Sequence, residues 1–259
     1  MTSAHTFYNS PRVAAGYAYA RPPVHPRVLQ HVRAHLHLTS AVARALDIGC
    51  GAGRSTAALA DVADRVVGID PAPAMMEHRR SVAPRARFVV GRAERLPFPD
   101  AAFNLITAAG SINYADLSLA LPETARVLAP QGTLVIYDFS AGRRFSDSGR
   151  LGDWYAEFDR RYPDAPGYDI DVRVLPFERA GLTLDAYHRF EVPIPMTLDS
   201  YLRYVMSETR IELALTMGVK ETDVREWCRL TLEDVFSEGE PRDVIFDAYA
   251  AYLERQRFS

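Results

Sequence analysis

Cysteine is scarce in this 259-residue chain, where only Cys50 and Cys228 occur, far apart in the sequence. Two isolated cysteines exclude a disulfide framework and fit a reducing compartment. Apolar runs are short as well, because none approaches the roughly 20 residues that a helix needs to cross a bilayer. Residues 1–9 lack the charged and apolar regions of a signal peptide. We therefore expect a soluble, cytoplasmic protein without a membrane partner.

An excess of positive charge is also missing. The chain has 30 lysine and arginine residues against 33 aspartate and glutamate residues, a net charge of −3, and it has no basic block. Neutralising the phosphates of a nucleic acid requires clustered cations. We therefore expect no nucleic acid among the partners.

Histidine offers one candidate metal pair. His31 and His35 lie one helical turn apart in a helix predicted at 28–38. Val32 follows His31, so the glutamate of the H-E-x-x-H motif is missing, and the sequence shows no third ligand. We predict no metal site here and a solvent-exposed helix face instead.

A glycine-rich loop is the most informative feature of what is present. A short apolar strand at 43–48 leads into Gly49, Gly51 and Gly53, and a helix is predicted at 54–60. Glycine lets the backbone turn tightly and approach a ligand, and the free N–H groups of the helix N-terminus lie beside it. The pattern is typical of an α/β protein that holds a nucleotide-like cofactor.

The spacing of this loop argues against a dinucleotide. A G-x-G-x-x-G fingerprint that starts at Gly49 requires its third glycine at position 54, where the chain has Arg54. Asp47, at the end of the strand, is predicted to point an anion into the site, where it would repel a pyrophosphate and suit a cationic group. An NAD(P)-dependent oxidoreductase is therefore the less favoured alternative.

Five stretches resemble the motifs of class I methyltransferases that depend on S-adenosyl-L-methionine (SAM), in the expected order and at the expected spacing. They are the glycine loop at 46–53, the acidic strand end at 67–71, the third loop at 90–98, the fourth strand at 103–106 and the turn at 126–134. The resemblance is to the methyltransferase type 11 domain and covers about residues 40–140. It implies a Rossmann-like core with SAM as the cofactor.

The resemblance also implies roles for individual residues. Asp70 ends the second predicted strand, where a carboxylate accepts hydrogen bonds from the ribose hydroxyls. Met75, on a helix predicted at 73–82, forms a wall of the adenine slot or, equally, fills the core. Ala93 and Glu94 are expected to hold adenine. The predicted cofactor-binding residues are Tyr17, Arg21, Asp47, Gly49, Cys50, Gly51, Asp70, Pro71, Met75, Ala93, Glu94 and Ala109.

The segment at 11–22 resembles the leading segment of methyltransferases of the ubiquinone-pathway and trans-aconitate types. The resemblance implies that this segment closes over the cofactor. Arg21 would pair with the carboxylate of SAM, as guanidinium geometry favours, and Tyr8 and Tyr17 would donate to it or shield the methyl group. The alternative is a surface arginine before a Pro-Pro turn.

Short strands and helices alternate through the core. Further strands are predicted at 65–69, 86–90, 103–108 and 132–138, with a helix at 117–128, and later strands at 183–192 and 244–252. This alternation predicts an α/β fold with a Rossmann-like, seven-stranded and mostly parallel sheet and helices on both faces. The last strand is antiparallel by family resemblance, and a helical cap is inserted after the fifth strand.

We predict four parts in the chain. They are an N-terminal helical segment at 1–42 that closes over the cofactor, a SAM-binding core at 43–139, a cap and substrate region at 140–240 that includes the sixth strand, and a C-terminal strand at 241–259 that completes the sheet. After a loop at 140–152, the cap has predicted helices at 152–162, 197–215 and 222–236. Its aromatic residues favour a small, partly apolar acceptor, and the alternative is packing helices without substrate contact. These residues are Trp154, Tyr155, Phe158, Tyr201 and Tyr204.

Together these features predict a SAM-dependent methyltransferase that moves a methyl group to an oxygen, nitrogen or carbon of a small molecule by in-line displacement. Most of the rate would come from positioning and desolvation, and a general base is needed only if the nucleophile must lose a proton. A non-catalytic SAM-binding sensor or pseudoenzyme remains the alternative. The catalytic residue is open among four candidates, Tyr114, Asp138, His188 and Glu208.

Overall fold

One sheet with the strand order β3-β2-β1-β4-β5-β8-β6 forms the centre of the protein, and β7 pairs with β8 off this path. The computed structural model describes residues 8–164, 170–236 and 240–256, so the ends of the predicted N-terminal and C-terminal parts, 1–7 and 257–259, lie outside the described residues. The strands are β1 (Val42–Ile48), β2 (Ala63–Asp70), β3 (Arg87–Val90), β4 (Phe103–Ala109), β5 (Leu128–Phe139), β6 (Arg144–Phe145), β7 (Leu182–Met196) and β8 (Arg242–Arg255).

The predicted fold class, a mostly parallel α/β sheet with helices, is confirmed, with one strand more than expected. Strands β1 to β5 run parallel, and β8 runs antiparallel to β5, β6 and β7. The additional strand is β6, which lies inside the predicted loop at 140–152. Its two residues pair with Val244 and Ile245, because β8 continues beyond the core and offers them a partner.

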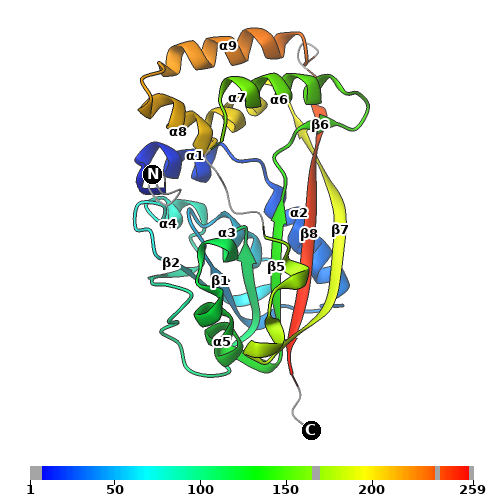
Figure 1. Cartoon of the computed structure of the whole chain (residues 1–259). Helices are drawn as coiled ribbons and strands as arrows, with labels where there is room; N and C mark the ends of the chain where they lie inside the picture. Colours follow the sequence, from blue (N-terminus) through cyan, green and yellow to red (C-terminus); the bar gives the residue numbers. More distant parts are fainter. Residues whose placement is uncertain (1–7, 165–169, 237–239, 257–259) are drawn as a thin grey trace.

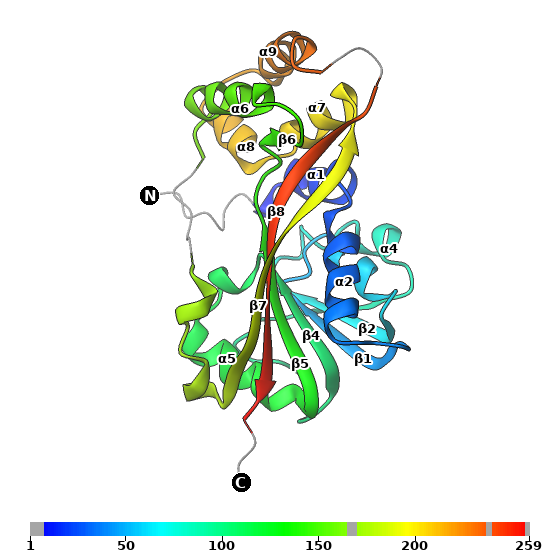
Figure 2. The same ribbon diagram turned by 90° about the vertical axis from the view of Figure 1, so that its right-hand side faces the viewer.

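Helices cover both faces of the core, and α2 (Val24–His35) packs on the face opposite to α5 (Leu117–Val127), as Figure 2 shows. Because both faces are covered, β1 ends in four consecutive buried residues instead of alternating ones. The other helices are α1 (Pro11–Tyr19), α3 (Arg54–Leu59), α4 (Arg79–Val82), α6 (Arg150–Arg161), α7 (Leu198–Met206), α8 (Thr209–Thr216) and α9 (Glu221–Glu233), with short 3-10 turns η2 (Ile112–Tyr114), η3 (Val172–Val174) and η4 (Phe177–Ala180). Within the described ranges, no helix combines the length and apolar character needed to cross a membrane.

The helix predicted at 73–82 is wrong in its extent. Only α4 is helical, and the chain before it forms turns. The amides of Met76, Glu77 and Arg79 each bond to the carbonyl three residues back, which is the pattern of 3-10 turns and not of an α-helix. Met75 therefore lies in a turn.

The cap is formed by α6 to α9 at one end of the elongated molecule (Figure 1). Strands β7 and β8 lie side by side and run from the core into the cap (Figures 1 and 2), so both parts share one continuous sheet. Trp154 stacks on Phe158 with ring centroids 5.1 Å apart, and Tyr155 and Tyr201 are buried in the same cluster. Four of the five predicted acceptor-facing aromatic residues therefore pack against one another, and only Tyr204 reaches the large pocket described below.

The single helix predicted at 197–215 is wrong, because the chain forms two helices there, α7 and α8, with a buried ion cluster at the break between them. Glu208 lies at the break with an extended backbone (φ −72°, ψ 148°). Its carboxylate accepts a hydrogen bond from the Tyr155 hydroxyl at 3.0 Å and lies 2.9 Å from Nε of Arg210. Arg210, only 2 % exposed, also pairs with Asp159 and Asp164. The break therefore allows one guanidinium to join α6, α8 and the chain after α6.

We expect the substitution Arg210→Met to lower the free energy of unfolding by about 3–5 kcal/mol, because it removes the direct ion-pair partner of the buried Glu208 carboxylate and of Asp159 and Asp164. Urea unfolding followed by circular dichroism measures this change. The matched control is Arg160→Met, which removes an exposed ion pair with Glu157 and should change stability by less than about 1 kcal/mol. Similar losses in both variants would contradict the structural role of Arg210.

Candidate functional site

The loop between β1 and α3 needs glycine for two separate reasons. Gly49, Gly51 and Gly53 have φ values of +72°, +49° and +90°, a region that other residues rarely adopt. A Cβ atom on Gly49 would also lie 2.3 Å from Cβ of Ser111, whose hydroxyl donates to the carbonyl of Ile48 at 2.6 Å. The loop after β4 therefore packs directly on the glycine loop.

Asp47 lies below this loop and not in the pocket, so the expectation that it points an anion into the site is wrong. Its carboxylate is fully buried and accepts hydrogen bonds from Ser55 and Thr56 of α3, both at 2.6 Å, and from Thr107 of β4 at 2.9 Å. Burial raises the pKa of Asp47 to about 6, although the three hydroxyl groups lower it. Asp47 thus holds α3 and β4 to the end of β1.

Asp70, at the end of β2, faces the pocket and also supports the glycine loop. One carboxylate oxygen accepts from the Gly51 amide and the other from the Ala72 amide, both at 2.8 Å. Burial raises the pKa of Asp70, and the two amides oppose that shift. Each oxygen keeps a further lone pair, which suits the two hydroxyls of a ribose.

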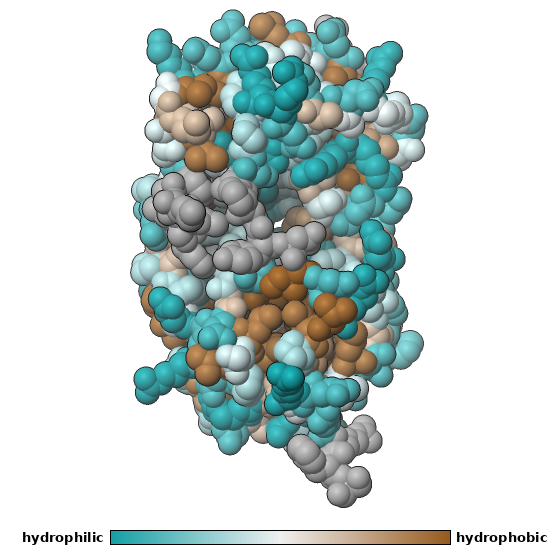
Figure 3. Space-filling view, in the orientation of Figure 1, coloured by the Kyte–Doolittle hydropathy of each residue, from teal (hydrophilic) through white to brown (hydrophobic). Residues whose placement is uncertain are grey.

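A pocket of about 690 Å³ lies beyond the carboxyl ends of the parallel strands, where ligands bind in open α/β sheets. The surface in Figure 3 is hollowed between the two ends of the molecule, and apolar residues gather just below the hollow. Of the predicted cofactor-binding residues, all except Asp47 line this pocket. They are Tyr17, Arg21, Gly49, Cys50, Gly51, Asp70, Pro71, Met75, Ala93, Glu94 and Ala109.

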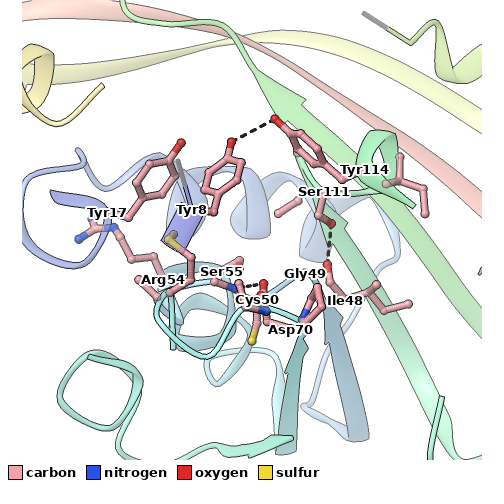
Figure 4. Close-up of a pocket in the computed structure, with 18 of the residues that line it drawn as sticks. Tyr8, Tyr17, Ile48, Gly49, Cys50, Arg54, Ser55, Asp70, Ser111 and Tyr114 are labelled. Atoms are coloured by element: carbon pink, nitrogen blue, oxygen red, sulfur yellow. Dashed lines mark hydrogen bonds between the residues drawn. The ribbon is translucent and has the colours of Figure 1, made fainter. Parts of the chain in front are cut away.

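Three tyrosine rings form the side of the pocket across from the glycine loop (Figure 4). The hydroxyls of Tyr8 and Tyr114 are 3.0 Å apart, and the rings of Tyr8 and Tyr17 meet edge to face with centroids 6.1 Å apart. Burial raises the pKa values of Tyr8 and Tyr114, so both phenols stay protonated at neutral pH. Both phenols can therefore donate hydrogen bonds at neutral pH.

Two guanidinium groups from different segments line the same pocket. Arg21 lies over the ring of Tyr17, 4.2 Å from its centroid, and donates to the carbonyl of Ser207 at 3.3 Å. Arg54 donates to the carbonyl of Ala18 at 3.1 Å. The Nε atoms of both arginines are buried and have no hydrogen-bond partner among the residues that the structure describes. Two guanidinium groups in the lining make this part of the pocket suited to an anionic group.

The four catalytic candidates separate clearly. Asp138 and Tyr114 line the pocket, whereas His188 and Glu208 do not. Glu208 belongs to the buried ion cluster of the cap. His188 lies with His31 and His35 where β7 packs on α2, and Nε2 of His31 is 3.2 Å from Nδ1 of His188.

The prediction of a solvent-exposed face on α2 is only partly met, because His31 and His35 are half-buried. His31 stacks on Phe190 with ring centroids 3.9 Å apart, and His35 packs on Tyr252 at the same distance. The two histidines thus cover the outer strands of the sheet. Among residues 8–164, 170–236 and 240–256, no group of three acidic, histidine or cysteine side chains is placed to hold a metal ion.

Sequence reasoning missed Arg54, His25 and Ser111 as pocket residues. Arg54 entered only as the residue that breaks the dinucleotide fingerprint, although its place at the start of α3 is a signal for an anion-facing cation. Ser111 had no signal, since its role depends on how closely two loops approach. His25 follows the Arg21-Pro-Pro turn, which shows that α2 begins at the pocket.

The residues present fit SAM. Asp70 offers acceptors for a ribose, and Gly49 and Gly51 allow the backbone to approach a ligand. Arg21 and Arg54 line the same pocket and offer positive charge to a carboxylate. A parallel sheet with this strand order, a glycine loop after β1 and an acid after β2 define a Rossmann-like protein of the SAM-binding class.

Comparison with known proteins agrees with this class. A family model described as a methyltransferase domain matches residues 46–136. The chain is 42% identical over 191 residues to demethylmenaquinone methyltransferase of Thermus thermophilus, an alignment that covers 71% of this chain and 82% of that protein. The chain belongs to the class I SAM-dependent methyltransferases, and SAM is its cofactor.

Other relatives match in part or in fold alone. An uncharacterized methyltransferase of Mycobacterium tuberculosis is 33% identical over 118 residues, which covers 46% of each protein, so the chain spans about half the length of this curated relative. The structure of a putative type II methyltransferase from Anaeromyxobacter dehalogenans aligns with a TM-score of 0.65 and 21% identity, over 91% of this chain and 96% of that one. This similarity shows a shared fold.

Asp47 should give the protein a distinctive pH dependence. Its pKa is about 6 in the folded protein and roughly 3.9 in an unfolded chain, so the folded protein binds the additional proton and loses stability as the pH rises through 6. Relative to Asp47→Asn, the free energy of unfolding of the wild type should fall by about 2–3 kcal/mol from pH 4 to pH 7. Urea unfolding at several pH values measures the difference in free energy of unfolding between the two proteins. A difference that did not change with pH would contradict the raised pKa of Asp47.

Gly49→Ala should lower the free energy of unfolding by about 1–3 kcal/mol and weaken the binding of S-adenosylhomocysteine (SAH), because the new Cβ meets Ser111 and the backbone is strained. The matched control is Gly149→Ala, where φ is −79° and no atom lies within 4 Å of the added Cβ. Its stability should change by less than about 0.5 kcal/mol. Urea unfolding and calorimetry test both variants, and equal behaviour of the two would count against the close packing of the loops.

Proposed function

We propose that the protein transfers the methyl group of SAM to an oxygen, nitrogen or carbon atom of a small-molecule acceptor held in the same pocket. The observation that carries this proposal is the composition of the 690 Å³ pocket. In addition to the cofactor-facing residues, it has a wall made of Tyr8, Tyr114, Asp138, Phe139 and Tyr204. This wall offers aromatic surface and a carboxylate to a second molecule.

The cofactor roles that we propose follow the positions of the side chains. Asp70 accepts from the ribose hydroxyls, Met75 and the backbone at Ala93 flank adenine, and Arg21 binds the carboxylate. The Glu94 carboxylate accepts a hydrogen bond from the Asp116 amide at 2.9 Å, which fixes the third loop against the start of α5. Glu94 is thereby held at the adenine end of the pocket.

SAM supplies a methyl group that is already activated, so the protein mainly has to position the acceptor and exclude water. We propose that the Tyr8–Tyr114 pair covers the pocket and orients the acceptor through its hydroxyls. Asp138, at the end of β5, is the proposed proton acceptor when the nucleophile must lose a proton. Close packing against Gly110, where a Cβ would lie 2.9 Å from Oδ1, keeps its carboxylate in place.

The acceptor to test first is demethylmenaquinone, because the Thermus thermophilus relative is named for it. Radiolabelled methyl transfer from SAM to reduced demethylmenaquinone, with product extraction, tests the assignment. Product formation would support it. Tight SAH binding without transfer to this compound would reject this acceptor and leave the methyltransferase assignment in place.

The division of the chain into four parts and its location in the cell also remain proposals. The cap at 140–240 contributes Tyr204 to the pocket, which supports its proposed part in substrate binding. Cys50 and Cys228 are both buried and free, which suits the reducing cytoplasm that we propose.

Asp70→Ala should weaken SAH binding by about 1.5–3 kcal/mol, or about 10- to 150-fold, because the ribose loses a charged acceptor. Titration calorimetry measures the affinity, and circular dichroism checks the fold. The matched control is Asp61→Ala, whose carboxylate is exposed and pairs with an exposed arginine. An unchanged affinity in folded Asp70→Ala would remove Asp70 from the proposed role.

Asp138→Asn should reduce kcat by about 10²- to 10⁴-fold on an acceptor that must lose a proton, because the amide cannot take it up. The affinity for SAH should stay within about threefold of wild type, since the substitution keeps the size of the side chain. Steady-state kinetics and calorimetry separate the two effects. A loss of SAH affinity without loss of kcat would argue for a cofactor contact instead.

A further inference from the structure

His25 is a pocket residue with an unusual environment. It is the second residue of α2, and its Nδ1 atom lies 2.9 Å from the hydroxyl of Tyr137 on β5. Its ring meets the rings of Tyr137 and Phe139 edge to face, with centroids 5.9 and 5.2 Å apart. These contacts fix the orientation of the imidazole at the border of the pocket.

The hydrogen bond to Tyr137 selects one tautomer of the ring. Tyr137 is fully buried, and His25 is the one partner of its hydroxyl among the described residues. If Nδ1 donated to the phenol, the buried phenolic proton would have no acceptor there, which is costly. Tyr137 therefore donates to Nδ1, and the ring proton resides on Nε2. Nε2 is the polar atom that the ring has left to offer a ligand.

The ring is also uncharged. Burial, together with the charges of Arg54 and Arg21, lowers the pKa of His25 to about 3. A neutral ring with its proton on Nε2 cannot take a proton from a substrate at that atom. It can donate a hydrogen bond, as Arg21 and Arg54 also do.

We propose that His25 is a positioning residue that donates its Nε2 proton to the carboxylate of the bound cofactor, beside the guanidinium groups of Arg21 and Arg54, which line the same pocket. The proposal rests on the proposed function, and it adds Arg54 and His25 to the site. The three side chains line one pocket from α3, from α2 and from the turn before α2, and the charges of Arg54 and Arg21 act on His25. A neutral donor adds a hydrogen bond without placing a further positive charge beside Arg21 and Arg54.

The test compares two ligands that differ at this end, SAH and 5′-methylthioadenosine, which lacks the amino-acid carboxylate. By titration calorimetry, His25→Ala should bind SAH about 5- to 20-fold more weakly and 5′-methylthioadenosine with unchanged affinity. His25→Gln, whose amide nitrogen can donate from a similar place, should restore SAH binding to within about threefold of wild type. The matched control His31→Ala, on the same helix but outside the pocket, should bind both ligands normally.

The tautomer can be measured independently of any ligand. Nitrogen-15 spectra of the imidazole should show a protonated Nε2 and an unprotonated Nδ1 in the wild type, and Tyr137→Phe should disturb this state. A proton on Nδ1 in the wild type would overturn the proposal. An equal loss of affinity for both ligands in His25→Ala, or no rescue by glutamine, would also overturn it, since either result points to general damage of the pocket.

Failure of the proposed function looks different. If the folded wild type bound neither SAH nor 5′-methylthioadenosine, the cofactor site itself would be wrong. If the wild type bound SAH tightly and His25→Ala bound it equally well, the role of His25 alone would be rejected.

Discussion

The buried carboxylate of Asp47 holds together the elements from which the pocket is built. Its hydrogen bonds join β1 to the first turn of α3 and to β4. The strand before the glycine loop and the helix after it are therefore held together. Burying an anion opposes folding, and three hydroxyl donors offset only part of that cost, as the raised pKa shows. Asp70 then fixes the position of the glycine loop by accepting a hydrogen bond from the Gly51 amide. One carboxylate thus maintains the framework, and the other faces the ligand.

The parts of the fold that follow from local patterns were predictable. The apolar strands, the glycine loop and the acid at Asp70 are encoded in short stretches, and the resemblance to the methyltransferases extends over the same region. The direction of Asp47 was not predictable, because it depends on hydroxyls that Ser55, Thr56 and Thr107 bring from two other elements. The sequence shows an acidic residue at the end of a strand, but it does not show whether the side chain faces the pocket or lies buried beneath the loop.

The misread regions have a shared cause, which is tertiary contact. The apolar spacing at 197–215 continues through a break that the pairing of Glu208 with Arg210 imposes. The aromatic residues of the cap resemble a binding surface, but most of them pack against one another. His25 and Arg54 had no pattern of their own. Their place in the pocket comes from the approach of α2 and α3, two helices that the sequence separates by a complete strand.

Strands β7 and β8 have a mechanical consequence. With 14 residues, β8 is roughly 45–50 Å long, and it is paired on β5 in the core and on β6 near the cap. A sheet that crosses from one part to the other acts as a stiff beam, since bending it would break a ladder of hydrogen bonds. This continuous pairing opposes hinge bending between the cap and the core. Tyr204 lies on the helix that follows β7, and Asp138 lies at the end of β5. The cap and the core therefore each bring a residue to the pocket from parts that the same sheet holds together.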